Sequence, residues 1–187
     1  MHDGSLYVSE GDSPSFLWLV NNGLRSHERP DFGGWGGRHG NAGGNQWNDA
    51  KDDGDNRKPL WRWTPATQND WAARMDWGVK SYEEANHPPV VVVDGELDRV
   101  VAPGETVSLS ASKTQDPDGD DLSFTWWQYY DADTVEARID IANSTSQTDA
   151  SFVVPDESGR NIHVILEVKD NGEPALTRYQ RVILTIQ

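Results

Sequence analysis

The stretch that decides the fold is Leu122–Tyr130, with the sequence LSFTWWQYY. Aromatic and β-branched residues are dense here, and no glycine or proline interrupts them, which predicts a β-strand. Successive side chains of a strand point to opposite faces. One face, with Phe124 and Trp126, is apolar and is expected to lie in a core. The opposite face ends in Trp127 and Tyr129, which predicts a second, aromatic surface.

Further short runs of alternating or β-branched residues surround this strand, with turn signals between them. The expected strands are Val90–Val93, Arg99–Val101, Thr106–Ala111, Leu122–Tyr130, Ile139–Ala142, Ala150–Val154, Asn161–Lys169 and Arg178–Ile186. Their spacing is typical of an immunoglobulin-like antiparallel β-sandwich, in which Trp126 would be the buried tryptophan of strand C. Cysteine is absent, so apolar packing must replace the usual disulfide between the sheets. The predicted fold class is therefore mainly β.

The two halves of the chain differ in composition. Residues 1–87 hold seven of the nine tryptophans and twelve of the seventeen glycines, with a net charge of -4, whereas residues 88–187 carry -11. The change falls at His87-Pro88-Pro89, and paired prolines resist helix and favour extended chain. We therefore expect a Trp/Gly-rich region over 1–87 and the sandwich over 88–187.

Two short helices are expected in the first region. Ser13 can cap a helix that begins at Pro14 and ends near Gly23. A second helix is expected from the capping-box pattern Thr67–Asp70 to about Ala85. Its apolar residues recur at helical spacing and are expected to be core or to cover another domain; they are Trp71, Met75, Val79 and Tyr82. Between the helices we expect a flexible loop over Asn41–Asn56 and an edge strand at Trp61–Trp63.

The chain is strongly acidic, with a formal net charge of -15 among 187 residues and a pI near 4.5. Such a surface repels phosphate backbones, so nucleic acid is not an expected partner. It is compatible with neutral polysaccharides and with cations such as calcium, or it serves solubility alone. No run approaches the roughly 20 apolar residues of a membrane span. Met1–Gly4 lacks the features of a signal peptide, so export would depend on a segment upstream or already removed.

Five stretches, taken in order, resemble one protein family. They are Glu10–Leu17, Gly33–Arg38, Asn69–Trp77, Glu83–Pro89, and Asp116–Asp120 followed by Trp126-Trp127. Together they are similar to bacterial nucleoside-hydrolase-like proteins with a C-terminal immunoglobulin-like domain, some of which are known as cellulose-binding proteins. The resemblance implies that residues 1–87 are the tail of an α/β hydrolase-like domain whose upstream part is a partner of this chain. It also implies an exported bacterial protein, secreted or periplasmic.

The same resemblance bears on catalysis. Asp12 falls where nucleoside hydrolases have the aspartate of a His-Asp-Pro motif, which implies a calcium ligand, although Gly11 replaces the histidine. The aspartate cluster of those enzymes is not in this sequence, and no Ser-His-Asp or zinc-type pattern is evident. We therefore expect no catalytic residues in this chain alone. The parent protein would be the hydrolase, acting on glycosidic or N-glycosidic bonds.

Exposed aromatic rings are the candidate carbohydrate-binding residues. Trp127 and Tyr129 lie two apart on one strand face, roughly 6–7 Å along the strand, which can form a short stacking surface for sugar rings. The further candidates are Trp35, Trp47, Trp61 and Trp63. The alternative is that Trp127 and Tyr129 pack against residues 1–87. The sequence thus predicts a cellulose-type carbohydrate-binding module, or else a non-catalytic portion of a calcium-dependent hydrolase with a structural or interaction role.

Two acidic turns are candidate calcium ligands. Asp116, Asp118, Asp120 and Asp121 precede the Leu122–Tyr130 strand, and Asp170 follows the Asn161–Lys169 strand. In a sandwich of this type the two loops lie at the same end, and oxygen ligands from neighbouring loops suit calcium. The alternative is a pair of ordinary Asp/Gly turns.

Overall fold

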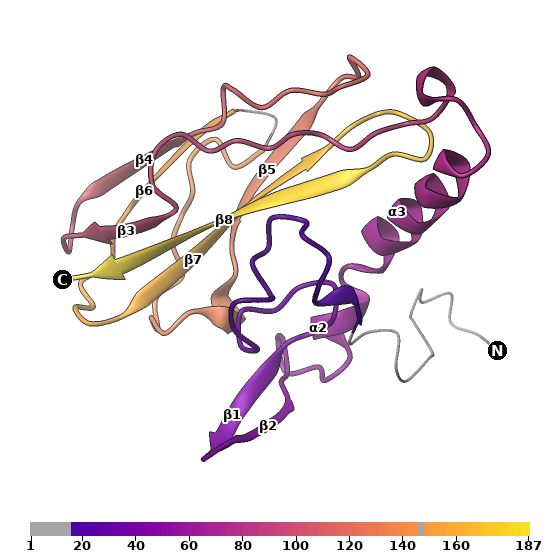
Figure 1. The fold of residues 1–187 in the computed structure, drawn as a ribbon. Helices are drawn as coiled ribbons and strands as arrows, with labels where there is room; N and C mark the ends of the chain where they lie inside the picture. Colours follow the sequence, from indigo (N-terminus) through magenta and orange to yellow (C-terminus); the bar gives the residue numbers. More distant parts are fainter. Residues whose placement is uncertain (1–15, 146–147) are drawn as a thin grey trace.

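A computed structural model describes residues 16–145 and 148–187, and its main body is a β-sandwich (Figure 1). One layer is a four-stranded sheet in the order β3-β8-β7-β5, and the other is the pair β4-β6. The strands are β3 (Asp98–Val101), β4 (Thr106–Ser110), β5 (Ser123–Gln128), β6 (Asp149–Val153), β7 (Asn161–Lys169) and β8 (Thr177–Ile186). The prediction of a mainly β fold with a sandwich is confirmed. Neighbouring strands are antiparallel except β3 and β8, which pair in parallel.

Two expected strands are reduced to one isolated bridge each: Val90–Val93 and Ile139–Ala142. In each segment a side-chain oxygen accepts a hydrogen bond from a backbone amide, in place of the carbonyl of a neighbouring strand. The amide of Val92 donates to the Thr114 hydroxyl at 3.0 Å, and the amide of Ile139 donates to the Gln128 side chain at 2.8 Å. Amides already bonded in this way cannot continue a ladder.

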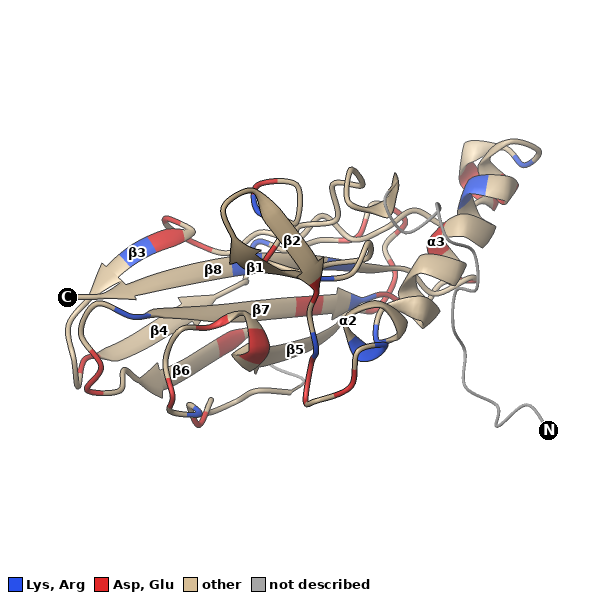
Figure 2. Cartoon of the chain, turned by 90° about the horizontal axis from the view of Figure 1, so that it is seen from below, with Lys and Arg blue, Asp and Glu red and all other residues tan. Residues whose placement is uncertain are grey.

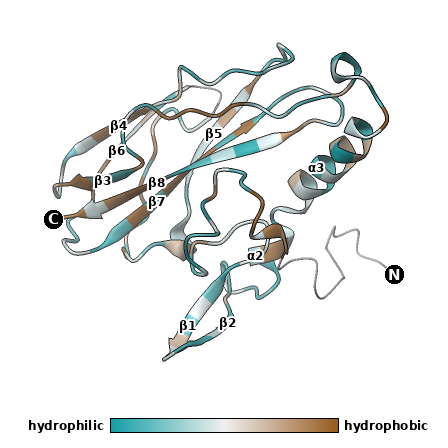
Figure 3. Cartoon of the chain, in the orientation of Figure 1, coloured by the Kyte–Doolittle hydropathy of each residue, from teal (hydrophilic) through white to brown (hydrophobic). Residues whose placement is uncertain are grey.

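The core lies between the two sheets. Alternate residues of β7, from Ile162 to Val168, point into it, and Trp126 of β5 is only 1% exposed there. The expected role of Trp126 as the core tryptophan is confirmed. In β8 the burial of the residues alternates along most of the strand, while Figure 3 shows that its first half is hydrophilic and its C-terminal half mainly hydrophobic. Among the described residues, no helix combines the length and hydropathy needed to cross a membrane.

The opposite face of the four-stranded sheet is covered by the N-terminal region (Figure 1). A second apolar cluster forms there from both halves of the chain: Leu24, Trp35, Trp63, Tyr129, Ile165 and Tyr179. The first three belong to the N-terminal region and the others to the sheet. The sheet is therefore buried on both faces, which explains why five consecutive residues of β7, from Ile162 to Leu166, are all buried.

Between residues 16 and 87, the described part of the N-terminal region contains a hairpin and the helices α2 and α3. Its elements are β1 (His39–Gly43), β2 (Gln46–Asp49), α2 (Lys58–Trp61), α3 (Thr64–Trp77) and the short 3-10 helix η1 (Tyr82–Glu84). A second 3-10 helix, η2 (Tyr130–Ala132), follows β5 in the sandwich. The expected loop over Asn41–Asn56 is therefore partly a hairpin. Its turn is possible because Gly43 and Gly44 adopt positive φ angles of 102° and 59°. The start of the helix expected at Ser13 lies outside the described residues.

Two expectations for this region are wrong. Trp61–Trp63 is not an edge strand but the end of α2 and the N-cap of α3. Pro59 and Pro65 sit in the first turns of these helices, where their fixed φ angle favours helix. The second helix also ends earlier than expected, at Trp77, and the capping box forms later, between Ser81 and Glu84.

The apolar stripe of α3 and its extension is not core. Its four residues are exposed by 64%, 53%, 84% and 61%: Trp71, Met75, Val79 and Tyr82. The buried residues of α3 are instead Thr64, Asp70 and Ala73, so its inward face has small side chains and one carboxylate. Asp70 is 4% exposed and forms ion pairs of 2.7 Å with Arg178 of β8 and with Arg74 of its own helix. The helix is thus attached by charge, and its apolar stripe points to solvent.

Candidate functional site

An open cavity of about 330 Å³ lies between the sheet and the helices α2 and α3. The sheet contributes Trp127 from β5, Glu167 and Lys169 from β7, and Thr177 and Tyr179 from β8. The facing residues from the helices and the link between them include Lys58, Arg62, Trp63 and Asn69. In Figure 2 the basic segment at α2 lies beside the end of β7, where an acidic and a basic residue follow one another. The cavity therefore combines aromatic and charged groups from both halves of the chain.

The strand register explains why these sheet residues meet. Glu167 pairs with Tyr179, and Lys169 pairs with Thr177, so four cavity residues form two adjacent rows on one face. Trp127 pairs with Ile165, one row further along. Paired residues of neighbouring strands lie within about 5.5 Å of each other. Because all five positions share the face opposite the sandwich core, they are free to meet a ligand or the N-terminal region.

The aromatic part of the cavity is built around Trp127, which is half-buried. Its ring lies 5.9 Å from that of Trp63, at an interplanar angle of 38°. The Arg62 guanidinium lies 4.9 Å from the centre of the Trp127 ring, a cation–π contact. Arg62 is itself held by Asp52, which is fully buried, at 3.0 Å. The indole is therefore held in one place by neighbours that are themselves fixed.

Asp52 also anchors other parts of this wall. It accepts hydrogen bonds from Arg38 at 2.8 Å and from the Tyr129 hydroxyl at 2.8 Å. Burial and the neighbouring carboxylate raise the pKa of Tyr129 well above its usual value, so the phenol remains a hydrogen-bond donor. The side chains that support Trp127 are thus held in place by Asp52.

Polar groups converge on the free space of the cavity. Glu167 is largely buried, and burial raises the pKa of its carboxyl, an effect that the charges of Lys169 and Arg62 oppose. Asn69 donates its amide N–H to the Ala175 carbonyl at 2.8 Å, which orients its side-chain oxygen. A fixed carboxylate, an ammonium and an amide can each bind hydroxyl groups.

The cavity does not have the pair of carboxyl groups that glycoside hydrolysis normally uses. Among the described residues that line it, Glu167 is the single carboxylate. The arrangement of two indoles with several hydrogen-bonding groups suits binding of a polar ligand with apolar faces.

The six aromatic candidates are distributed between core and surface. Trp127 and Trp63 line the cavity. Trp35 and Tyr129 are each 1% exposed, so they present no ring face to solvent, and for Tyr129 the packing alternative holds. Two more lie on separate elements outside the cavity, with exposures of 37% and 41%: Trp47 on β2 and Trp61 on α2.

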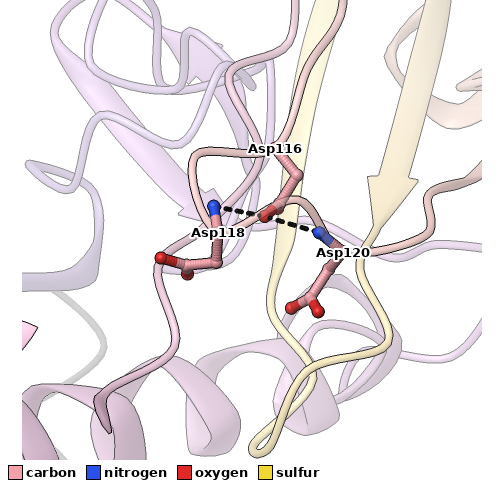
Figure 4. A group of neighbouring side chains, drawn as sticks. All are labelled: Asp116, Asp118 and Asp120. Atoms are coloured by element: carbon pink, nitrogen blue, oxygen red, sulfur yellow. Dashed lines mark hydrogen bonds between the residues drawn. The ribbon is translucent and has the colours of Figure 1, made fainter. Parts of the chain in front are cut away.

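Three of the predicted calcium ligands lie together in the structure. The carboxylates of Asp116, Asp118 and Asp120 lie within 4.8 Å of one another (Figure 4). One oxygen of Asp116 accepts the backbone amides of Asp118 and Asp120, at 2.9 and 3.2 Å, while the other is buried without a hydrogen-bond partner. Burial and the neighbouring acids raise the pKa of Asp120. His87 contacts Asp118 at 3.1 Å, so this carboxylate is partly engaged.

The other predicted ligands do not join this group. Asp170 is 3% exposed and accepts the amides of Gly172 and Leu176, at 3.1 and 2.7 Å, so it closes its own loop. The side chain of Asp121 is outside the cluster, although its amide donates to Asn171 at 3.0 Å and thereby links the two loops. Asp12 lies outside the described residues.

Two family models match the chain. Residues 106–186 match the C-terminal domain of the cellulose-binding protein Sde0182, and residues 2–39 match the nucleoside hydrolase-like domain of cellulose-binding Sde182. Both models describe parts of cellulose-binding proteins of one type, and the chain is similar to them over these two ranges. The resemblance to nucleoside-hydrolase-like cellulose-binding proteins expected from the sequence is thereby confirmed.

A solved structure is similar to nearly the whole chain. A nucleoside hydrolase-related hypothetical protein from Saccharophagus degradans, described as associated with carbohydrate metabolism, is 36% identical, with a TM-score of 0.84. The match covers 97% of this chain and 49% of that one, so the chain spans about half the length of its relative. The solution structure of the PKD domain from KIAA 1837 protein is 19% identical over 51% of this chain and 86% of that one, with a TM-score of only 0.35. No curated protein matches the sequence.

Several cavity residues were not predicted from the sequence. Glu167 and Lys169 occupy the face of β7 opposite its apolar row, where a charged pair on an otherwise buried strand is a readable signal. Arg62 and Asn69 carry no such signal, because their position depends on how α2 and α3 lie against the sheet.

Proposed function

We propose that this chain binds a polysaccharide of the cellulose type in the cavity between the sheet and helices α2 and α3. The observation that carries the proposal is the half-buried Trp127 ring set beside the polar groups of Glu167, Lys169 and Asn69. Sugar rings present C–H faces that pack on indole, and their hydroxyls need fixed donors and acceptors. The names of the matched family models and the carbohydrate link of the Saccharophagus relative support the same ligand class.

Affinity electrophoresis tests this proposal. Native gels that contain hydroxyethylcellulose, xylan or another soluble glycan are expected to retard the wild-type chain. Trp127→Ala should abolish the retardation, whereas Trp71→Ala, which removes an exposed indole that does not line the cavity, should not. A wild-type chain that no glycan retards, in gels or in pull-down on insoluble cellulose, would contradict the proposal.

A second candidate function is interaction with a nucleoside-hydrolase-like domain. The exposed apolar residues of α3 and the segment after it favour this function, because four large apolar side chains between residues 71 and 82 are exposed. This chain covers about half of the Saccharophagus relative, so that nucleoside hydrolase-related protein has a further part that this chain does not match. We propose that this stripe packs against such a domain. Mixing the chain with a separately produced hydrolase-like domain should give a complex that Trp71→Ser and Met75→Ser disrupt; unchanged complex formation would contradict it.

We also propose a structural calcium ion at Asp116, Asp118 and Asp120. The buried and unpaired oxygen of Asp116 supports it, since a buried carboxylate oxygen normally has a partner. Calcium prefers six to eight oxygen ligands, so backbone carbonyls and water would complete the set. A polysaccharide ligand and a calcium ion both suit a secreted or periplasmic protein, and we propose that location for the parent.

A further inference from the structure

We propose that the cavity takes a short segment of a single glycan chain and not the flat face of crystalline cellulose. This inference rests on the proposed polysaccharide binding and adds the physical form of the ligand. It follows from the arrangement of the aromatic rings, the size of the cavity and the directions from which polar groups reach it.

Binding to a crystalline face requires several exposed aromatic rings in one plane. Among the described residues the rings around Trp127 are tilted: the interplanar angle is 38° to Trp63 and 49° to Tyr129. Trp63 and Tyr129 are also buried, at 2% and 1% exposure. The more exposed tryptophans, Trp47, Trp61 and Trp71, belong to three different elements. No flat stacking surface is therefore available at the cavity.

The cavity itself sets the size of what it can hold. Its volume of about 330 Å³ lies at the lower end of ligand cavities, which span about 300–1,000 Å³ and which enclose most of a small ligand's surface. That volume suits roughly one or two sugar rings. The flat surface of a fibre cannot enter it.

The polar groups surround the free space and do not lie on one side of it. Glu167 and Lys169 reach it from β7 and Asn69 from α3. On the aromatic side, the Arg62 guanidinium lies over the Trp127 ring at 4.9 Å and so reduces the ring area open to a ligand. A ligand enclosed between sheet and helices can bond through hydroxyls on opposite edges of its ring, as a single chain offers and a packed crystal face does not.

The test compares soluble and crystalline ligands. Isothermal titration with cellohexaose should show binding, and swollen amorphous cellulose should retain the chain. Microcrystalline cellulose should retain it weakly, and free cellohexaose should compete for whatever is retained. Glu167→Gln and Asn69→Ala should each weaken cellohexaose binding about tenfold or more, because the first replaces a charged acceptor by a neutral amide and the second removes the amide. Glu167→Gln nearly preserves the side-chain volume, and Asn69 is a partly exposed position. Near-ultraviolet circular dichroism checks that both variants fold. Trp71→Ala is the matched control outside the cavity.

The outcomes separate this inference from the function on which it rests. Retention on microcrystalline cellulose that cellohexaose does not displace would overturn the single-chain inference and leave polysaccharide binding in place. Cellohexaose binding that is unchanged in both Glu167→Gln and Asn69→Ala would overturn the assignment to this cavity. Absence of binding to every glucan, soluble or insoluble, would overturn both proposals.

Discussion

Arg181 donates a hydrogen bond of 2.7 Å to Nδ1 of His163, and both side chains are buried beneath the N-terminal region. The guanidinium also donates to the carbonyls of Leu24, Phe32 and Gly33, at 2.7, 2.7 and 2.9 Å. Because arginine has no acceptor, Nδ1 of His163 must carry the lone pair. Burial lowers the pKa of Arg181 to about 10, so it stays charged at neutral pH. One cation of β8 thus fastens the N-terminal region to the sheet.

Replacing this cation should loosen that region. Arg181→Met leaves three carbonyls and one imidazole nitrogen without their donor, so we expect the free energy of unfolding to fall by about 3–5 kcal/mol. Urea unfolding measures the loss, and limited proteolysis should cut earlier around residues 24–40. Arg160→Met, at an exposed position, is the matched control. Equal stability of the two variants would show that the Arg181 network does not hold the region.

Two buried groups on this face should give opposite pH dependences. Burial raises the pKa of Asp133 from 3.8 to about 7, so its contribution to stability is full below pH 4 and is lost as pH rises through 7. Burial lowers the pKa of His163 from 6.5 to about 3, so its contribution is present above pH 6.5 and is lost as pH falls toward 3. In the wild type the two trends partly cancel.

Asp133→Asn should remove one of these trends. The side chain accepts the amide of His163 at 2.5 Å and the amide of Gln128 at 2.7 Å, so the substitution has a constant cost from one lost acceptor. Relative to the wild type, the variant should gain stability from pH 5 to pH 8, by at most about 3 kcal/mol. Urea titrations at several pH values measure this, and a difference that does not change with pH would contradict the assigned cause.

The acidic turn should respond to calcium. If the ion binds only the folded state, a hundredfold excess over Kd adds about 2.7 kcal/mol, which raises Tm by roughly 5–10 °C in a chain of this size. Asp116→Asn should remove the response, and Asp156→Asn, an acidic residue in a different turn, should retain it. Differential scanning fluorimetry with calcium, magnesium and chelator measures the shift. An unchanged Tm in calcium and chelator counts against the ion.

The two faces of α3 should differ in their contribution to stability. Trp71→Ser alters a side chain that is 64% exposed and should change the free energy of unfolding by no more than about 0.5 kcal/mol. Asp70→Asn removes the buried partner of Arg178 and should cost about 3 kcal/mol or more, because it leaves a cation without its anion. Chemical unfolding of both variants decides the matter; a larger loss for Trp71→Ser than for Asp70→Asn would show that the apolar stripe is part of the fold.

Much of the sandwich can be predicted from local pattern. Strand alternation depends only on neighbouring residues, so the apolar row of β7 and the core position of Trp126 are evident in the sequence. The strands that fail, at Val90–Val93 and Ile139–Ala142, do so because distant side chains bind their amides. The candidate site is harder to predict, because its residues come from β5, β7, β8 and two helices.

The sequence by itself determined that Leu122–Tyr130 is a two-faced strand, that its apolar face is core and that the chain resembles cellulose-binding proteins. Only the tertiary structure decided what covers the second face. There Tyr129 lies buried with its hydroxyl on Asp52, while Trp127 borders an open cavity. Two residues with the same local pattern differ because the N-terminal region packs fully over one and leaves the other half-open. That packing depends on contacts between residues up to 157 positions apart, which no local pattern records.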